Sequence, residues 1–230
     1  MLTLEQVRFE RGAFSLSADW SLKTGARVAV IGPSGGGKST LLSLIAGFES
    51  PREGRVVMDG EDQTGRRPGE RPLSIVFQEG NLFPHLTVAQ NVGMGLSPSL
   101  RLGAREREAV EDVLTRVGLA GMGGRKPAAL SGGQRARVAL ARVLLRDKPL
   151  LLLDEAFSAL GPALKDEMFE LLDAVVGSEK TVVMVTHDPL EASRMGDIVV
   201  VDDGMAAAPA EAGPLLADPS PQLRAYLGRG

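Results

Sequence analysis

A glycine-rich segment at residues 32–40 constrains the fold of this chain more than any other feature. The apolar residues 28–31 before it predict a buried strand, and residues 41–46 after it have a helical pattern. A strand, the pattern GxxxxGK[ST] and a helix, in this order, define a phosphate-binding loop. The loop comprises Gly32, Pro33, Ser34, Gly35, Gly36, Gly37, Lys38, Ser39 and Thr40. The segment therefore predicts an α/β fold that binds a nucleoside triphosphate.

The residue types of this loop suit phosphate chemistry. Glycines allow successive backbone N–H groups to turn inward and form a nest for phosphate oxygens. We expect Lys38 to reach the β- and γ-phosphates and the Ser39 hydroxyl to ligate Mg²⁺, while the helix N-terminus adds its dipole. A chance glycine-rich turn is the alternative, and the flanking strand and helix argue against it.

Two kinds of strand pattern indicate the fold class. Apolar and polar residues alternate over residues 14–22, which is typical of a half-buried antiparallel strand. Residues 1–10 and 55–59 look like its companions, with a turn at Asp59-Gly60. Uninterrupted apolar runs instead favour parallel strands covered by helices on both faces. These runs lie at residues 28–31, 75–77, 150–153, 182–185 and 198–201.

The remaining patterns outline the domains. A helical pattern ending at Gly118 belongs to a predicted helical insert at about residues 86–147. We predict an α/β domain over residues 1–205, with a small antiparallel β subdomain and this insert. Residues 206–230 are rich in proline and alanine and predict a loosely packed tail with one short helix at about residues 222–227.

Composition excludes several classes of function. The net charge of −3 argues against a protein that coats nucleic acid, so no nucleic-acid partner is expected. The chain has no cysteine, which rules out disulfides and thiolate chemistry. No apolar run is long enough to span a bilayer, and the N-terminus lacks a signal-peptide pattern. We therefore expect a cytosolic chain that meets a membrane only through a partner.

Polar residues follow three of the apolar strands. Asp154 and Glu155 end the run at residues 150–153, where a carboxylate can hold Mg²⁺ and its neighbour can act as general base. His187 and Gln78 end two other strands, on the edge where α/β sheets place ligands. The alternatives are two solvated acids and a structural histidine.

The segment Leu130-Ser-Gly-Gly-Gln identifies the family that the chain resembles. Ser131 is a good helix N-cap, and the glycines that follow open a helix whose N-terminus is a second anion site. With LLLLDE downstream, this segment resembles the ABC ATPase family over about residues 1–205.

The resemblance implies a function for each of these positions. Two subunits would sandwich ATP, which is bound in trans by Ser131, Gly132, Gly133 and Gln134. Asp154 would hold Mg²⁺, and Gln78 would be the metal-binding glutamine whose loop senses Mg²⁺ and the transmembrane partner. Glu155 would be the catalytic base, and His187 would contact the γ-phosphate. Two residues depart from the family pattern. Arg11 replaces an aromatic residue that stacks on adenine; a guanidinium can also stack on a base, and Phe9 or Phe14 could substitute. Gly161 replaces an aspartate that communicates across the dimer.

The segment at residues 77–92 resembles the importer branch of the family, particularly the thiamine importers. Importers of ferric iron, polyamine, molybdate or sulfate are the related alternatives, and a soluble ABC ATPase of DNA repair or ribosome work is the other class. The importer reading implies a homodimer at the cytoplasmic face of the inner membrane, bound to permease subunits and indirectly to a periplasmic substrate-binding protein. Residues 80–86, with Leu82, Phe83, Pro84 and Leu86, suggest the permease-docking site. The alternative is that Phe83 and Leu86 pack into the core.

Overall fold

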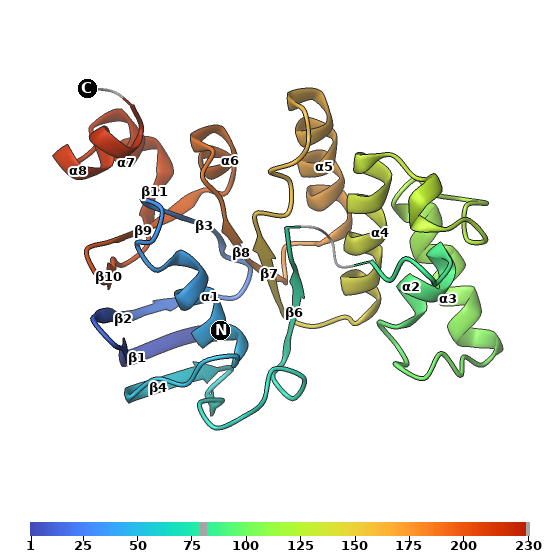
Figure 1. The fold of residues 1–230 in the computed structure, drawn as a ribbon, viewed down its shortest axis with the longest axis horizontal. Helices are drawn as coiled ribbons and strands as arrows, with labels where there is room; N and C mark the ends of the chain where they lie inside the picture. Colours follow the sequence, from blue (N-terminus) through green and yellow to red (C-terminus); the bar gives the residue numbers. More distant parts are fainter. Residues whose placement is uncertain (79–81, 229–230) are drawn as a thin grey trace. The chain divides into compact units, whose positions relative to one another are not determined.

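The computed structural model describes residues 1–78 and 82–228, and the chain folds into two compact units (Figure 1). The first unit comprises Met1–Leu73, Leu152–Glu155 and Lys180–Gly230. The second unit comprises Ser74–Leu151 and Ala156–Glu179. The phosphate loop therefore belongs to the first unit, and the segment Leu130-Ser-Gly-Gly-Gln belongs to the second.

The first unit begins with an antiparallel sheet. Strands β1 (Leu2–Arg11), β2 (Phe14–Leu22), β4 (Glu53–Met58) and β5 (Glu61–Asp62) pair antiparallel. Every second side chain of β2 is buried, from Leu16 to Leu22, which confirms the predicted alternation. The turn between β4 and β5 contains Asp59 and Gly60 with φ of 49° and 80°, the positive values that a tight hairpin requires.

Strands in the same unit with continuous apolar sequences are almost entirely buried: of residues 28–31, 182–185 and 198–201, only Val200 is partly exposed. β3 (Arg27–Ile31) pairs in parallel with β8 (Thr181–Val185) on one side and with β9 (Asp197–Asp202) on the other. The order of strands is β5-β4-β1-β2-β10-β9-β3-β8, where β10 comprises Met205–Ala206, and residues 152–154 of β7 (Leu150–Asp154) also belong to this unit. Parallel strands present their carboxyl ends on one edge, and this edge carries the phosphate loop.

Helix α1 (Lys38–Ala46), which follows the phosphate loop, is held at its C-terminal end by a buried arginine. Arg71 is only 1% exposed, and its Nη1 donates to the carbonyl oxygens of Leu44 at 2.7 Å and Ile45 at 2.8 Å. A cation at this end complements the helix dipole and satisfies carbonyls that have no intrahelical partner. Sequence reasoning missed this contact, because Arg71 lies in an irregular segment without any periodicity.

The C-terminal segment of the first unit is more ordered than the loosely packed tail that the sequence predicts. It contains β10 (Met205–Ala206), β11 (Ala210–Glu211), α7 (Ala212–Ala217) and α8 (Pro221–Tyr226). Helix α8 matches the helix predicted at residues 222–227. Ala206, Ala212 and Leu223 are each 3% exposed, so contacts with the rest of the unit order this segment. Elements of two to six residues have too little periodicity to be read from sequence.

The second unit is mainly helical. Its helices are α2 (Val88–Gly93), α3 (Ala104–Arg116), the 3₁₀ helix η1 (Pro127–Ala129), α4 (Gly132–Leu145) and α5 (Pro162–Val175). Helices α2, α3 and α4 pack against one another, and α4 also packs against α5. The unit also contains residues 74–76 of β6 (Leu73–Val76) and residues 150–151 of β7. Across residues 1–78 and 82–228, no helix has both the length and the apolar sequence needed to cross a membrane.

Candidate functional site

The phosphate loop requires glycine at its first position. Gly32 has φ of 148°, and a Cβ atom there would lie 2.0 Å from the carbonyl oxygen of Val201 in β9. Gly37, at the end of the loop, is the N-cap of α1 with φ of 111°. Both conformations are open to glycine and strained for other residues. The chain thus turns sharply from β3 into α1, which is the arrangement that the sequence predicts.

Lys38 lies inside this turn. Its Nζ donates to the carbonyl oxygens of Gly32 at 2.8 Å and Pro33 at 2.9 Å. Burial lowers the pKa of Lys38, and the nearby Glu155 carboxylate opposes this shift. The ammonium therefore lies against the loop backbone, where it can contact an anion bound in the loop.

A hollow of about 230 Å³ opens beside the loop. It is lined by Arg11, Phe14, Gly35, Gly37, Lys38, Ser39 and Thr40. A Cβ on Gly37 would lie 3.0 Å from Cζ of Phe14, so the phenyl ring lies directly on the loop. Arg11 is held by Glu49, with 2.8 Å between Nη1 and Oε1, whereas Phe9 is only 5% exposed and lies outside the hollow lining. Of the three residues considered for adenine, Arg11 and Phe14 thus face the hollow.

The acidic end of β7 lies in the same unit as the loop. Glu155 has φ of 46°, and its N–H donates to the carbonyl of Val185 at 3.0 Å, which fixes this left-handed turn. Its Oε2 lies 3.4 Å from Nδ1 of His187. Burial raises the pKa of Asp154, and the Glu155 carboxylate raises it further. The structure thus brings together Lys38, Glu155 and His187, three of the predicted site residues.

A buried network that sequence reasoning missed holds the turn around His187. The Thr186 hydroxyl donates to Oε2 of Glu191 at 2.5 Å and accepts from the N–H of Asp188 at 3.0 Å. Asp188 in turn caps α6 (Pro189–Arg194) by accepting from the N–H of Leu190 at 2.9 Å. Thr186 and Glu191 are 2% and 3% exposed. The backbone on both sides of His187 is therefore fixed, while its side chain is exposed.

The donor set of the first unit fits Mg²⁺. Ser39 offers a hydroxyl and Asp154 a carboxylate, both hard oxygen ligands of the kind that Mg²⁺ prefers. In the described part of the chain, no three His, Cys, Asp or Glu side chains gather closely enough to hold a metal ion by themselves. Mg²⁺ usually arrives with substrate phosphates and needs only one or two protein carboxylates, so these two residues suffice.

In the second unit, the segment Leu130-Ser-Gly-Gly-Gln forms the predicted helix cap. The Ser131 hydroxyl accepts from the N–H of Gln134 at 3.2 Å, and the Gln134 side chain accepts from the N–H of Ser131 at 3.0 Å. This reciprocal capping box opens α4. Gly133 is buried, and a Cβ there would lie 3.2 Å from the side chain of Leu164. The N–H groups of Gly132 and Gly133 have no acceptor within the helix, which favours an anion at this position.

Three further predicted positions also lie in the second unit. Gln78 follows β6 and has an exposed side chain. Gly161 is the N-cap of α5 with φ of −70°, and a Cβ there would meet no atom within 4 Å. An aspartate at Gly161 would therefore fit without strain.

Of the proposed docking segment at residues 80–86, residues 80 and 81 lie outside the described residues.

The described part of that segment is fixed by a buried asparagine. Asn91 is 0% exposed, accepts from the N–H of Phe83 at 2.7 Å and donates to the carbonyl of Phe83 at 3.1 Å. The Phe83 side chain itself is 39% exposed. The backbone is therefore held in place while the ring faces outward, which argues against Phe83 as a core residue.

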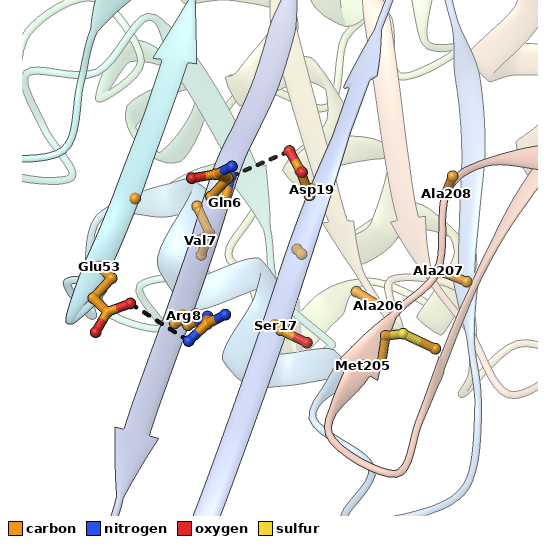
Figure 2. Close-up of a pocket in the computed structure, with 12 residues that line it drawn as sticks. Gln6, Val7, Arg8, Ser17, Asp19, Glu53, Met205, Ala206, Ala207 and Ala208 are labelled. Atoms are coloured by element: carbon orange, nitrogen blue, oxygen red, sulfur yellow. Dashed lines mark hydrogen bonds and ion pairs between the residues drawn. The ribbon is translucent and has the colours of Figure 1, made fainter.

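A larger hollow of about 500 Å³ lies elsewhere in the first unit, over β1, β2 and β10 (Figure 2). Its charged side chains already have partners. Arg8 lies 3.7 Å from Glu53, and Asp19 accepts from the N–H of Gln6 at 3.2 Å. None of the predicted site residues lines this hollow, so we assign it no function.

Comparisons with known proteins identify the family of this chain. Residues 16–158 match the ABC transporter family, and the chain belongs to that family. It is 54% identical over 230 residues to the thiamine import ATP-binding protein ThiQ of Cereibacter sphaeroides, which covers 99% of this chain and 100% of that protein. It is 51% identical to ThiQ of a Ruegeria species, with the same coverage.

A solved structure has the same fold. It is the ATP-binding cassette MJ0796 in a dimeric post-hydrolysis state bound to ADP and Pi. The TM-score is 0.79 at 31% identity, covering 92% of this chain and 99% of that one. The mixed α/β fold is thus that of an ABC ATPase, and the chain is an ATP-driven translocase subunit.

Proposed function

We propose that this chain is the ATP-hydrolysing subunit of a thiamine importer. The observation that carries the proposal is the similarity to ThiQ proteins, which runs over 99% of the chain at 51% and 54% identity. Similarity confined to the nucleotide site would support only the family. Here it includes the helical unit, the part of the chain expected to meet a partner.

ATP binds with its phosphates in the loop Gly32, Pro33, Ser34, Gly35, Gly36, Gly37, Lys38, Ser39 and Thr40. Lys38 supplies the positive charge for the β- and γ-phosphates. Ser39 and Asp154, with Gln78 as the third proposed ligand, would hold Mg²⁺, which would offset negative charge on the phosphates. Glu155 takes a proton from the attacking water, and His187 contacts the γ-phosphate. The 3.4 Å separation of Glu155 and His187 supports this pairing of roles.

The active form is a head-to-tail homodimer. Ser131, Gly132, Gly133 and Gln134 of one copy close over the ATP held by the phosphate loop of the other. Two features support this arrangement: the helix N-terminus that these residues open, and the dimeric form of the cassette MJ0796. The dimer binds permease subunits at the cytoplasmic face of the inner membrane, and a periplasmic substrate-binding protein delivers the substrate to that complex.

Reconstitution tests the proposal. The chain is assembled in vesicles with a permease and a substrate-binding protein from the same genome, with ATP on the side of this chain. Uptake of labelled thiamine that requires ATP is the expected result. Uptake of ferric iron, a polyamine or an oxyanion instead, with no thiamine transport, would assign the complex to a related importer.

A further prediction concerns the permease-docking surface. Phe83→Ala should abolish most thiamine uptake in these vesicles and leave the ATPase activity of the free chain unchanged. Exposed aromatic anchors often contribute about 2 kcal/mol or more to an interface, enough to uncouple two subunits. The second unit also has an apolar hollow of about 450 Å³ lined by α2, α3 and the segment between them, which a permease helix would fit.

Met205→Ala is the matched control, since it removes an apolar side chain that is 58% exposed in the first unit. It should change neither uptake nor hydrolysis. If Phe83→Ala lowers the melting temperature and the free ATPase together, the ring is part of the core and the docking surface lies elsewhere.

A further inference from the structure

A buried carboxylate follows His187 in the sequence and takes no part in the proposed hydrolysis. Glu191, in α6, is 3% exposed, and Thr186, which follows β8, is 2% exposed. The Thr186 hydroxyl donates to Oε2 of Glu191 at 2.5 Å, within the range of hydrogen bonds that a carboxylate accepts. Burial of a carboxylate costs free energy, and apolar residues of similar volume often give equal stability. The gain from this pair therefore lies in the conformation that it fixes.

The Thr186 residue ties the backbone on both sides of His187. Its hydroxyl oxygen accepts from the N–H of Asp188 at 3.0 Å, so the turn closes around His187. The N–H of Thr186 donates to the carbonyl of Val30 at 3.2 Å, in β3, the strand that leads into the phosphate loop. The residue before His187 is thus fixed to the strand of the phosphate loop, and the residue after it is fixed to a buried hydroxyl.

Glu191 sets the direction of this hydroxyl. A carboxylate only accepts hydrogen bonds, so the hydroxyl donates its single proton to Glu191 and keeps its lone pairs for the N–H of Asp188. The carboxylate comes from the first turn of α6, the helix that Asp188 caps. Both partners of the Thr186 hydroxyl therefore belong to one short segment, which closes a hydrogen-bonded loop around His187.

The His187 ring depends on this backbone for its place. Its side chain is 59% exposed, so packing restrains it little, yet Nδ1 lies 3.4 Å from Oε2 of Glu155. We propose that Thr186 and Glu191 are positioning residues, whose hydrogen bond holds the His187 backbone so that the ring faces Glu155 and the γ-phosphate. The inference rests on the proposed contact between His187 and the γ-phosphate. Thr186 and Glu191 act through His187 and contact no reacting atom.

Thr186→Val tests the proposal because valine keeps the branched shape of threonine but lacks the hydroxyl. The kcat for ATP hydrolysis should fall about three- to tenfold, the equivalent of one lost hydrogen bond. The affinity for ADP should stay the same, because ADP lacks the phosphate that His187 is proposed to contact. Ser193→Ala is the matched control, since it removes an exposed hydroxyl of α6 that donates to the carbonyl of Leu190 at 2.8 Å. It should leave kcat unchanged.

Two changes at Glu191 separate the hydrogen bond from packing. Glu191→Gln keeps an oxygen that can accept from Thr186, and it should keep kcat within about twofold of the original value. Glu191→Met fills a similar volume without that acceptor and should lower kcat as Thr186→Val does. If Glu191→Met and Thr186→Val both hydrolyse ATP as fast as the unchanged chain, the proposal is wrong.

Removal of the histidine shows whether the pair acts through this residue. In a His187→Ala background, Thr186→Val should lower kcat by less than about a further twofold, because the group that the hydroxyl positions is gone. The same loss in both backgrounds would indicate a general structural role for Thr186 and would overturn the proposal.

The placement of the ring has a readout that does not need hydrolysis. The chain has two histidines, and His85 belongs to the second unit. The imidazole NMR signals of His187, assigned with His187→Ala, should shift in Thr186→Val, whereas those of His85 should not. Unchanged signals of His187 would contradict the proposal even if hydrolysis falls. If His187→Ala alone hydrolyses ATP at the full rate, the failure lies with the proposed contact to the γ-phosphate, and the NMR signals still test the placement of the ring.

Discussion

Glu155→Gln is expected to lower the rate of ATP hydrolysis by about 10²–10⁴-fold, the usual contribution of a general base. The amide keeps the size of the side chain and can occupy the same left-handed turn at the end of β7. It cannot accept a proton from the attacking water. Binding of ATP should remain, because the carboxylate makes no proposed contact that holds the nucleotide. Phosphate release and calorimetric titration with ATP measure the two quantities separately.

The same variant should accumulate as a dimer on a sizing column when Mg²⁺ and ATP are present. Glu179→Gln, an exposed position in the second unit, is the matched control and should keep full activity. Hydrolysis by Glu155→Gln at more than about a tenth of the original rate would remove Glu155 from the role of base, because such a loss is below the usual range.

Lys38→Ala is expected to weaken ATP binding by about 10²–10³-fold, the range found when one partner of a buried charge pair is truncated. The phosphate loop would keep its backbone N–H groups but lose the cation that is curled over them. Calorimetric titration with ATP and Mg²⁺ measures the loss.

Lys23→Ala removes an exposed lysine from the same unit and should leave the affinity unchanged. Native-like affinity in Lys38→Ala would contradict the assignment of the phosphate loop. The melting temperature of Lys38→Ala should stay close to that of the unchanged chain. This measurement distinguishes a loss of ATP binding from unfolding or aggregation of the variant.

Sequence reasoning located the elements with strong periodicity and the residues that form compact motifs. The alternation in β2, the apolar β8 and the turn before α1 all have local patterns that follow from backbone geometry. The capping box of Ser131 and Gln134 is also local, since its two residues are three apart.

Contacts between distant parts of the chain could not be predicted from the sequence. Arg71 at the end of α1 and Asn91 beside the Phe83 backbone each depend on where irregular segments pass in space. Polar residues outside periodic segments read as ordinary loop residues, and only the fold shows that they are buried. The short elements of the C-terminal segment were missed for the same reason, because tertiary contacts rather than local preference order them.

Cross-linking between two copies tests most directly whether ATP is bound by two subunits. The chain has no cysteine, so Ser34→Cys in one batch and Ser131→Cys in another introduce single thiols, both in the Glu155→Gln background. Both positions are exposed. A short bis-maleimide is expected to join the two variants into a dimer only when they are mixed with Mg²⁺ and ATP, and neither variant should cross-link alone. Absence of that product in the mixture, while both variants bind ATP, would contradict the head-to-tail dimer.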